Sequence, residues 1–491
     1  MYSGTTFSTV RGEIWHNDFP LGIARVGRVS FSCTHNTSLP IILFYFNFLL
    51  YSVLRNALKE FRHEIYDCFE YASDALFNLA DALMTESQAQ SVLELTLSPN
   101  FERKWPSLYE ALQMGQVNQT RFEQTMVRYA PHPFDGERLV LAVDATNIER
   151  PFSTTSADRG WLYKHNLPNC DKPVTVGWQF STVVVVPAQT SSHTYIVSNR
   201  RIKTSQTPAE VASQQLSELR PYFAERPLNL GDRYYPTKAF IQNSSKDYDL
   251  LLRLKSNRVF YRKVVRDEQK RGRGAPAKHG ARFQCNDPNT HGLPQRVWVG
   301  TDENGHKLVV SAWTELHLRE APELALSIIR IQREAASGKT HDPLESWYVW
   351  SGQTELDLTQ VWSYYKRRYS IEHGYRFDKQ DLLWEKPRLR YPSQFELWTA
   401  IVSLVHDELQ IAQGLGLEVL RPWENSQRQP SPQQIRRGLS GIIVQLGSPA
   451  KASKVRGNGK GRAVGTKVRP ATRYKVVKKG VSTSNLTNIR C

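Results

Sequence analysis

Short apolar runs of strand length, followed twice by an aspartate, limit the fold of this chain more than any other sequence feature. The predicted strands are Leu139–Val143, Val174–Phe180, Thr182–Val186, Thr194–Val197, Leu228–Leu230 and Asp249–Leu254. A helix is predicted from Pro208 to Leu219, between the fourth and fifth of these runs. Strands and helices that alternate along the chain in this way indicate an α/β fold.

The region before these strands is predicted to be helical. Residues 56–131 are expected to form four helices. The clearest pattern, at helical spacing, is Leu58, Phe61, Ile65, Phe69, Leu76, Leu79 and Leu83. Pro106 suits the first turn of a later helix that ends at Met114.

Residues 1–55 have doubtful relevance to the fold. The apolar run from Leu39 to Leu54 contains Pro40 and Asn47 and falls short of the ~20 residues that span a membrane. We therefore expect no membrane anchor. We also expect that residues 1–52 are upstream sequence, so that a start at Val53 would give a complete protein.

Residues 256–345 are predicted to be a β-rich insertion. A hairpin is indicated around Asn304-Gly305, a strong tight-turn signal. The loop from Arg262 to Arg282 carries eight Lys or Arg against two acids. For Trp298 and Trp313 we favour core packing over contact with a DNA base.

The C-terminal part is predicted to combine two long helices with a basic tail. A strand at Trp347–Trp350 precedes helices expected at 356–383 and 393–413. Fifteen of the 64 Lys and Arg residues, and none of the 47 acids, follow Glu424. We expect this tail to be flexible and to bind a polyanion, because it concentrates positive charge without a counter-charge.

The predicted organisation therefore has six parts. They are a leader (1–55), a helical domain (56–135), a first α/β part (136–255), the β-rich insertion (256–345), a second α/β part (346–420) and the tail (421–491). The five cysteines are scattered without a CxxC pair, which argues against a zinc site or a disulfide framework. A reducing, cytoplasmic location is expected.

Two carboxylates are placed where α/β proteins carry chemistry. Asp144 and Asp232 each follow a predicted strand, and functional groups gather at the carboxyl ends of strands. An aspartate after a strand is more often a turn former or a helix cap, so neither residue is decisive alone.

A third carboxylate lies on a helix beside two cations. Tyr365, Arg368, Glu372 and Lys379 fall on one stripe of the helix predicted at 356–383. Such a stripe suits a metal ion beside a phosphate. The plain alternative is an exposed ion pair between Arg368 and Glu372.

This spacing, Tyr-x2-Arg-x3-Glu-x6-Lys, resembles the YREK signature of bacterial insertion-sequence DDE transposases. Asp144-Ala145-Thr146 and Asp232-Arg233-Tyr234 resemble the contexts of the two aspartates of that family. The resemblance covers about residues 56–415. It implies an RNase H-like core with a mixed sheet, in which Asp144, Asp232 and Glu372 cluster.

The resemblance also implies an activity and its partners. These are metal-dependent cleavage of double-stranded DNA at element ends and strand transfer of the 3′-hydroxyl, by a homodimer. Asp144, Asp232 and Glu372 would hold Mg²⁺, which Mn²⁺ would replace, since Mg²⁺ prefers carboxylate oxygens. The rival hypotheses are another RNase H-like nuclease, such as a resolvase, and a catalytically inactive DNA-binding descendant.

The DNA-binding residues expected from this hypothesis fall in two groups. On the helix, Arg368 and Lys379 would bind phosphate and Tyr365 would hydrogen-bond to the backbone. In the basic loop, Lys270, Arg271 and Arg273 would contact DNA near the carboxylates.

Overall fold

The computed structural model describes residues 39–478 of the 491, with gaps. The gaps are residues 134–136, 165–172, 265–276, 335–343, 416–419, 426–427, 455–462, 464 and 468–469, and only the backbone is described up to residue 50. The three basic-loop residues Lys270, Arg271 and Arg273 therefore lie outside the described residues.

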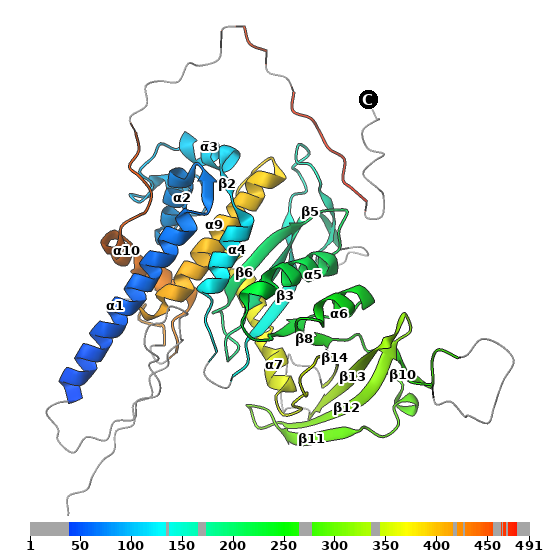
Figure 1. The fold of residues 1–491 in the computed structure, drawn as a ribbon. Helices are drawn as coiled ribbons and strands as arrows, with labels where there is room; N and C mark the ends of the chain where they lie inside the picture. Colours follow the sequence, from blue (N-terminus) through cyan, green and yellow to red (C-terminus); the bar gives the residue numbers. More distant parts are fainter. Residues whose placement is uncertain are drawn as a thin grey trace, which may run out of the picture.

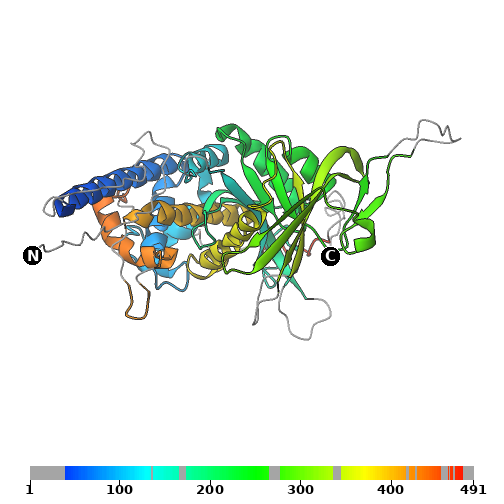
Figure 2. The same cartoon turned by 90° about the horizontal axis from the view of Figure 1, so that it is seen from below.

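The helical region forms one end of the molecule (Figures 1 and 2). Its helices are α1 (Leu39–Tyr66), α2 (Ser73–Thr85), α3 (Pro106–Met114) and α4 (Gln119–Arg128). In the described part of the chain, no helix is long and apolar enough to cross a membrane.

The long helical pattern predicted from Leu58 to Leu83 is in fact two helices. The chain leaves α1 for a short strand, β1 (Phe69–Tyr71), which pairs with β2 (Gln116–Val117). Ala72 then takes a left-handed conformation, with φ of 57°, and α2 starts. Both helices bury apolar faces in the same core, which is why their residues shared one apparent period.

A single mixed sheet of twelve strands forms the body of the protein. Its main path is β10-β9-β12-β13-β14-β8-β7-β3-β5-β4, with β6 paired to β5 and β11 to β12. The strands are β3 (Val140–Glu149), β4 (Gly160–Tyr163), β5 (Val174–Val185), β6 (Tyr195–Ile202), β7 (Leu228–Gly231), β8 (Asp249–Arg253), β9 (Val259–Arg262), β10 (Arg282–Gln284), β11 (Arg296–Thr301), β12 (Lys307–Leu318), β13 (Ala321–Arg333) and β14 (Glu345–Ser351).

The central strands run in both directions. β3, β7 and β8 are parallel neighbours, whereas β5 is antiparallel to both β3 and β6. Strand β3 does not end at Asp144 as predicted but continues to Glu149, because β5 pairs with it along its whole length. The two runs predicted at 174–180 and 182–186 are likewise one strand, β5.

Helices cover both faces of these central strands (Figure 1). On one face, Gln215 of α5 (Pro208–Leu219) hydrogen-bonds to Ser181 of β5. On the other, the ring of Phe180 packs against Phe395 of α9 (Pro392–Ile411). Neighbouring residues of a strand point to opposite faces, so β5 is buried on both sides.

The β-rich region extends the same sheet instead of forming a separate one. The predicted hairpin is present as β11 and β12, and Gly305 in its turn has φ of 80°. Strand β13 pairs with β14 over six residues, and β14 pairs with β8 over four. The insertion is therefore hydrogen-bonded into the central strands.

The helix predicted at 356–383 is two helices with a tightened joint. These are α7 (Val361–Arg367) and α8 (Ser370–Gln380). At the joint, the N–H groups of Arg368 and Tyr369 donate to carbonyls three residues back, at 3.1 Å each, as in a 3₁₀ turn. The four stripe residues are therefore divided between two helices.

The tail is more ordered at its start than its composition predicted. Helix α10 (Pro432–Leu446) begins with a Ser431 capping box and packs on α2 and α9. The guanidinium of its Arg436 is 1% exposed and donates to the carbonyls of Leu83, Glu86 and Asp381. An arginine in the tail thus serves as a buried cap for neighbouring helices.

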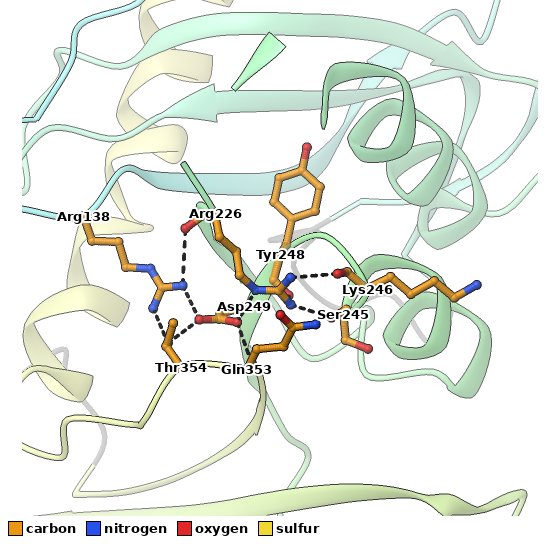
Figure 3. Close-up of polar contacts among 8 residues, drawn as sticks. All are labelled: Arg138, Arg226, Ser245, Lys246, Tyr248, Asp249, Gln353 and Thr354. Carbon is orange, nitrogen blue, oxygen red and sulfur yellow. Dashed lines mark hydrogen bonds and ion pairs between the residues drawn. The ribbon is translucent and has the colours of Figure 1, made fainter. Parts of the chain in front are cut away.

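The buried carboxylate of Asp249 links the N-terminal ends of the parallel strands β3, β7 and β8 through hydrogen bonds (Figure 3). Asp249, at the beginning of β8, accepts hydrogen bonds from Arg138 before β3, Arg226 before β7, and Thr354 and Gln353 after β14. Its side chain is 0% exposed. These contacts fix the level at which the strands begin, at the end opposite Asp144 and Asp232.

Candidate active site

Two aspartates lie side by side on neighbouring parallel strands. Val143 of β3 is in register with Gly231 of β7, and Asp144 and Asp232 are the next residue of each strand. Residues in register on parallel strands point to the same face. Burial raises the pKa of Asp144, and the negative charge of Asp232 raises it as well.

Arg368 contacts two of the three predicted carboxylates. Its Nη1 lies 3.5 Å from Oδ2 of Asp144, and its Nη2 donates to Oε1 of Glu372 at 2.7 Å. Arg368 is 4% exposed, whereas the side chain of Glu372 is 52% exposed. The guanidinium therefore lies between a largely buried carboxylate and an exposed one.

Tyrosine rings surround the buried guanidinium of Arg368. The rings of Tyr365 and Tyr369 are centred 5.6 Å and 5.1 Å from its central carbon. Burial alone would lower the pKa of Arg368, but its acidic neighbours raise the pKa above the ordinary value. Arg368 therefore stays a permanent positive charge at this position.

Asp144 is the strained member of the cluster. Burial, with the charges of Asp232 and Glu372, raises its pKa to about 6, against the lowering effects of Arg368 and of the Ala145 N–H. One arginine thus leaves part of the negative charge uncompensated. An added cation would stabilise the ionised form of Asp144.

Lys379, whose phosphate contact stays a prediction, contacts the strand that carries Asp144. Its Nζ donates to the carbonyl of Asn147 on β3 at 2.8 Å, and burial lowers its pKa. One turn earlier on α8, the hydroxyl of Tyr375 donates to the carbonyl of Asp144 at 3.0 Å. Both side chains attach α8 to β3, one at Asp144 itself and one three residues further along the strand.

Tyr375 was missed by the sequence reasoning, although the pattern could have revealed it. It follows Glu372 by three residues and so falls on the face that Glu372 and Lys379 share. Tyr365, which was predicted to bind the DNA backbone, is 1% exposed. Its hydroxyl has no hydrogen-bond partner in the described structure, and burial raises its pKa to about 12.

A buried ion pair supports α8 from behind. Nδ1 of His406 on α9 lies 2.7 Å from Oδ1 of Asp378, and its Nε2 lies 2.8 Å from the carbonyl of Thr194. Burial lowers the pKa of His406, but Asp378 outweighs this and the pKa rises to about 9. Asp378 is therefore part of the support of the helix that carries Glu372.

The donor set suits a hard divalent cation, although the described carboxylates are not gathered around one point. No group of three or more His, Cys, Asp or Glu side chains in the described residues is spaced to hold a metal ion. Arg368 lies between Asp144 and Glu372 instead. Carboxylate oxygens are nevertheless the ligands that Mg²⁺ prefers, and the raised pKa of Asp144 shows that more positive charge would be stabilising.

The two insertion tryptophans pack in the interior, as favoured from the sequence. Trp313 is 1% exposed and stacks on Trp347 with ring centres 5.7 Å apart. Trp298 is partly buried against the core, and its ring lies over Gly300, where a side chain would collide with it. Neither ring is presented for base stacking in this arrangement.

Comparison with known proteins identifies the family. The sequence matches the family described as DDE superfamily endonuclease over residues 64–320, which include Asp144 and Asp232 and stop before Glu372. No curated protein matches the chain. Among solved structures, the piggyBac transposase synaptic complex with hairpin DNA has a TM-score of 0.38 and 10% identity, covering 77% of this chain and 74% of that one. The family match spans more than half of the sequence, and the chain belongs to the DDE superfamily of endonucleases.

Proposed function

We propose that this protein is a DNA transposase of the YREK group of bacterial insertion sequences. It would cleave element ends and transfer the freed 3′-hydroxyl to target DNA. The observation that carries the proposal is the placement of Asp144 beside Asp232 on parallel strands, with Glu372 linked to Asp144 through Arg368. Membership of the DDE endonuclease superfamily does not distinguish a transposase from a resolvase or from an inactive descendant. The YREK residues favour a transposase over a resolvase.

The strand order supports an RNase H-like core as part of this proposal. The order β6-β5-β3-β7-β8 has three antiparallel strands followed by two parallel ones. Helices α5 and α6 (Lys238–Ser244) make the connections into β7 and β8. In this arrangement Asp144 lies on the central strand and Asp232 at the end of its neighbour.

Asp144, Asp232 and Glu372 would hold the divalent ions of the reaction. Such ions activate the attacking oxygen and neutralise charge on the phosphate. Arg368 would keep a positive charge beside the reacting phosphate whether Asp144 is protonated or ionised. Tyr375 and Lys379 would hold β3 against α8, so that Asp144 keeps its position relative to Glu372.

The remaining partners belong to the proposal as well. Double-stranded DNA would bind across the carboxylates, and two copies of the chain would bring two element ends together. The ordered start of the tail, α10, would hold the basic residues that follow it close to the protein body.

The decisive experiment replaces Glu372 by glutamine and assays cleavage of a supercoiled plasmid that carries the element ends. Removal of one carboxylate charge should lower Mg²⁺- or Mn²⁺-dependent cleavage by at least about a hundredfold, while DNA binding in Ca²⁺ remains. The matched control is Glu385→Gln, an exposed glutamate just after α8. Asp378 cannot serve as a control, because it is paired with the buried His406.

Wild-type cleavage by the Glu372→Gln protein would refute the assignment of the third carboxylate. Binding without cleavage by the unmodified protein, with either metal, would support the inactive DNA-binding alternative.

A further inference from the structure

The end of the described tail is attached to the sheet far from α10. Residues Pro470–Lys478, here called the arm and drawn in red in Figure 1, run beside β4. The N–H of Tyr474 donates to the carbonyl of Thr154 at 2.8 Å, and the N–H of Val477 donates to the carbonyl of Arg159 at 2.8 Å. Val477 also forms a parallel bridge with Gly160, the first residue of β4. The arm therefore extends this edge of the sheet.

A buried arginine forms the seat of the arm. Arg159 is 2% exposed and donates to the carbonyls of Ser156 at 3.1 Å, Arg150 at 3.0 Å and Tyr474 of the arm at 3.2 Å. Burial lowers its pKa, and no carboxylate is paired with it in the described structure. A buried guanidinium is costly unless its N–H groups are hydrogen-bonded. The carbonyl of Tyr474 from the arm therefore completes the set of acceptors around Arg159.

The seat is hydrogen-bonded to the end of the strand that carries Asp144, because Arg159 donates to the carbonyl of Arg150, the residue that follows β3. Strand β3 runs from Asp144 to Glu149 toward β4, a distance of about 17 Å for five residues of strand. Along the way, the amide of Asn147 donates to the carbonyl of Tyr163 on β4 at 2.7 Å. A duplex that bound at Asp144 and followed β3 would reach this surface within one helical turn, which is about 34 Å.

The arm brings unpaired positive charge to this surface. Arg473, Lys475 and Lys478 are all exposed. No ion pair of these three residues is found among the described contacts.

The described acids next to Arg150 and Arg159 in the sequence are already paired with other residues. Glu149 pairs with Lys164 at 2.9 Å, and Asp158 pairs with Arg201. The positive charge of the arm is therefore available to an external anion.

Exposed aromatic side chains follow Gly160, the residue that Val477 of the arm pairs with. On β4, Trp161 and Tyr163 alternate with buried residues and are 48% and 55% exposed. Rings interleaved with cations are typical of surfaces that bind nucleic acid.

We propose that the arm and β4 together bind the backbone of the DNA that flanks the reacting phosphate. This inference rests on the proposed function, since the continuity with Asp144 selects DNA over an acidic protein. The docked position is essential to it: the three cations would act from fixed points beside the catalytic strand instead of from a free tail.

The first test removes the charge of the arm. In the full-length protein, Arg473, Lys475 and Lys478 are replaced by glutamine, and binding to a duplex of about four helical turns is measured in EDTA over a range of salt concentrations. Three lost phosphate contacts should weaken binding about tenfold or more and make the slope of log K against log salt less steep by about 2 to 3. The control carries glutamine at Lys59, Lys104 and Lys246, three exposed lysines on other parts of the surface.

The second test releases the arm without changing its charge. Val477→Pro removes the N–H that donates to Arg159, whereas Val476→Pro alters the neighbouring valine, whose N–H makes no described hydrogen bond. Val477→Pro should bind the duplex more weakly than Val476→Pro, and trypsin should cut after Arg473 faster in Val477→Pro than in Val476→Pro.

The outcomes separate this inference from the proposed function. All measurements are of binding without metal, so an inactive enzyme would leave the result intact. Equal affinity and equal salt slope for the two triple variants would overturn the DNA surface and leave an acidic protein as the partner to seek. Equal affinity for the two proline variants would overturn the role of the docked position.

Discussion

Replacing Asp249 by asparagine should destabilise the protein and disturb the active site from the opposite end of the sheet. The substitution keeps the shape of the side chain but removes the charge that Arg138 and Arg226 share (Figure 3). Gly352 packs against this carboxylate so closely that any added side chain would collide with it. The surroundings therefore have little room to rearrange.

The expected size of the effect follows from the burial of the partners. Loss of one member of a buried ion pair costs about 3–5 kcal/mol. The side chains of Arg138 and Arg226 are 20% and 17% exposed, and water can partly solvate them, so we expect about 3 kcal/mol. For a cooperative unit of about 400 residues, this lowers the Tm by about 3–4 °C.

The dependence on pH provides an independent check. Burial raises the pKa of Asp249, but hydrogen bonds from Thr354, Arg226 and Arg138 outweigh it, and the pKa lies below its ordinary value. A carboxylate with a lowered pKa stabilises the fold above about pH 4, and this contribution is lost as the pH falls through the lowered pKa. The difference between wild type and Asp249→Asn should therefore be full at pH 7 and shrink below pH 4.

The assay is thermal unfolding followed by tryptophan fluorescence, with Asp247→Asn as control. Asp247 lies two residues earlier and makes no ion pair in the described structure. Cleavage should also fall at temperatures where Asp249→Asn is still folded, because the starts of β3, β7 and β8 are no longer held level. A Tm equal to that of the Asp247→Asn control at pH 7 would refute the reasoning.

Two further predictions concern groups whose pKa is raised. Asp144→Asn should raise the Tm of the metal-free protein at pH 8, because the folded state destabilises an ionised Asp144 above its pKa of about 6. The gain in Tm should vanish below about pH 4. An unchanged Tm at pH 8 would contradict the destabilisation of the ionised carboxylate. The pair of His406 with Asp378 should add stability that is full below about pH 6.5 and is lost as the pH rises through about 9; a His406→Gln protein should lack that loss in a Tm series from pH 6 to 10.

Local signals in the sequence predicted several elements well. Helix α5 has the predicted bounds, Pro208–Leu219, because Thr207 and Glu210 form a capping box around Pro208. The hairpin at Asn304-Gly305 is equally local, since glycine suits the positive φ of its turn.

Features that depend on distant partners were predicted less well. The extension of β3 to Glu149 depends on pairing with β5, and the division between α7 and α8 depends on how Arg368 is buried between two carboxylates. For Lys379, the hydrogen bond to a carbonyl on β3 could not be predicted from the helical stripe, and its phosphate contact stays a prediction. Helix α10 was missed because glycine, serine, proline and arginine surround it in the tail.

The continuity of the twelve-stranded sheet has a mechanical consequence. Hydrogen bonds run without interruption from the β11–β12 hairpin through β13, β14 and β8 to β7 and β3. A load applied at the outer hairpin cannot be absorbed by a hinge, because the path contains no unpaired strand. Such a load should therefore change the twist of the whole sheet, including β3 and β7 next to Asp144 and Asp232. The outer hairpin and the carboxylates are therefore coupled through the twist of one continuous sheet.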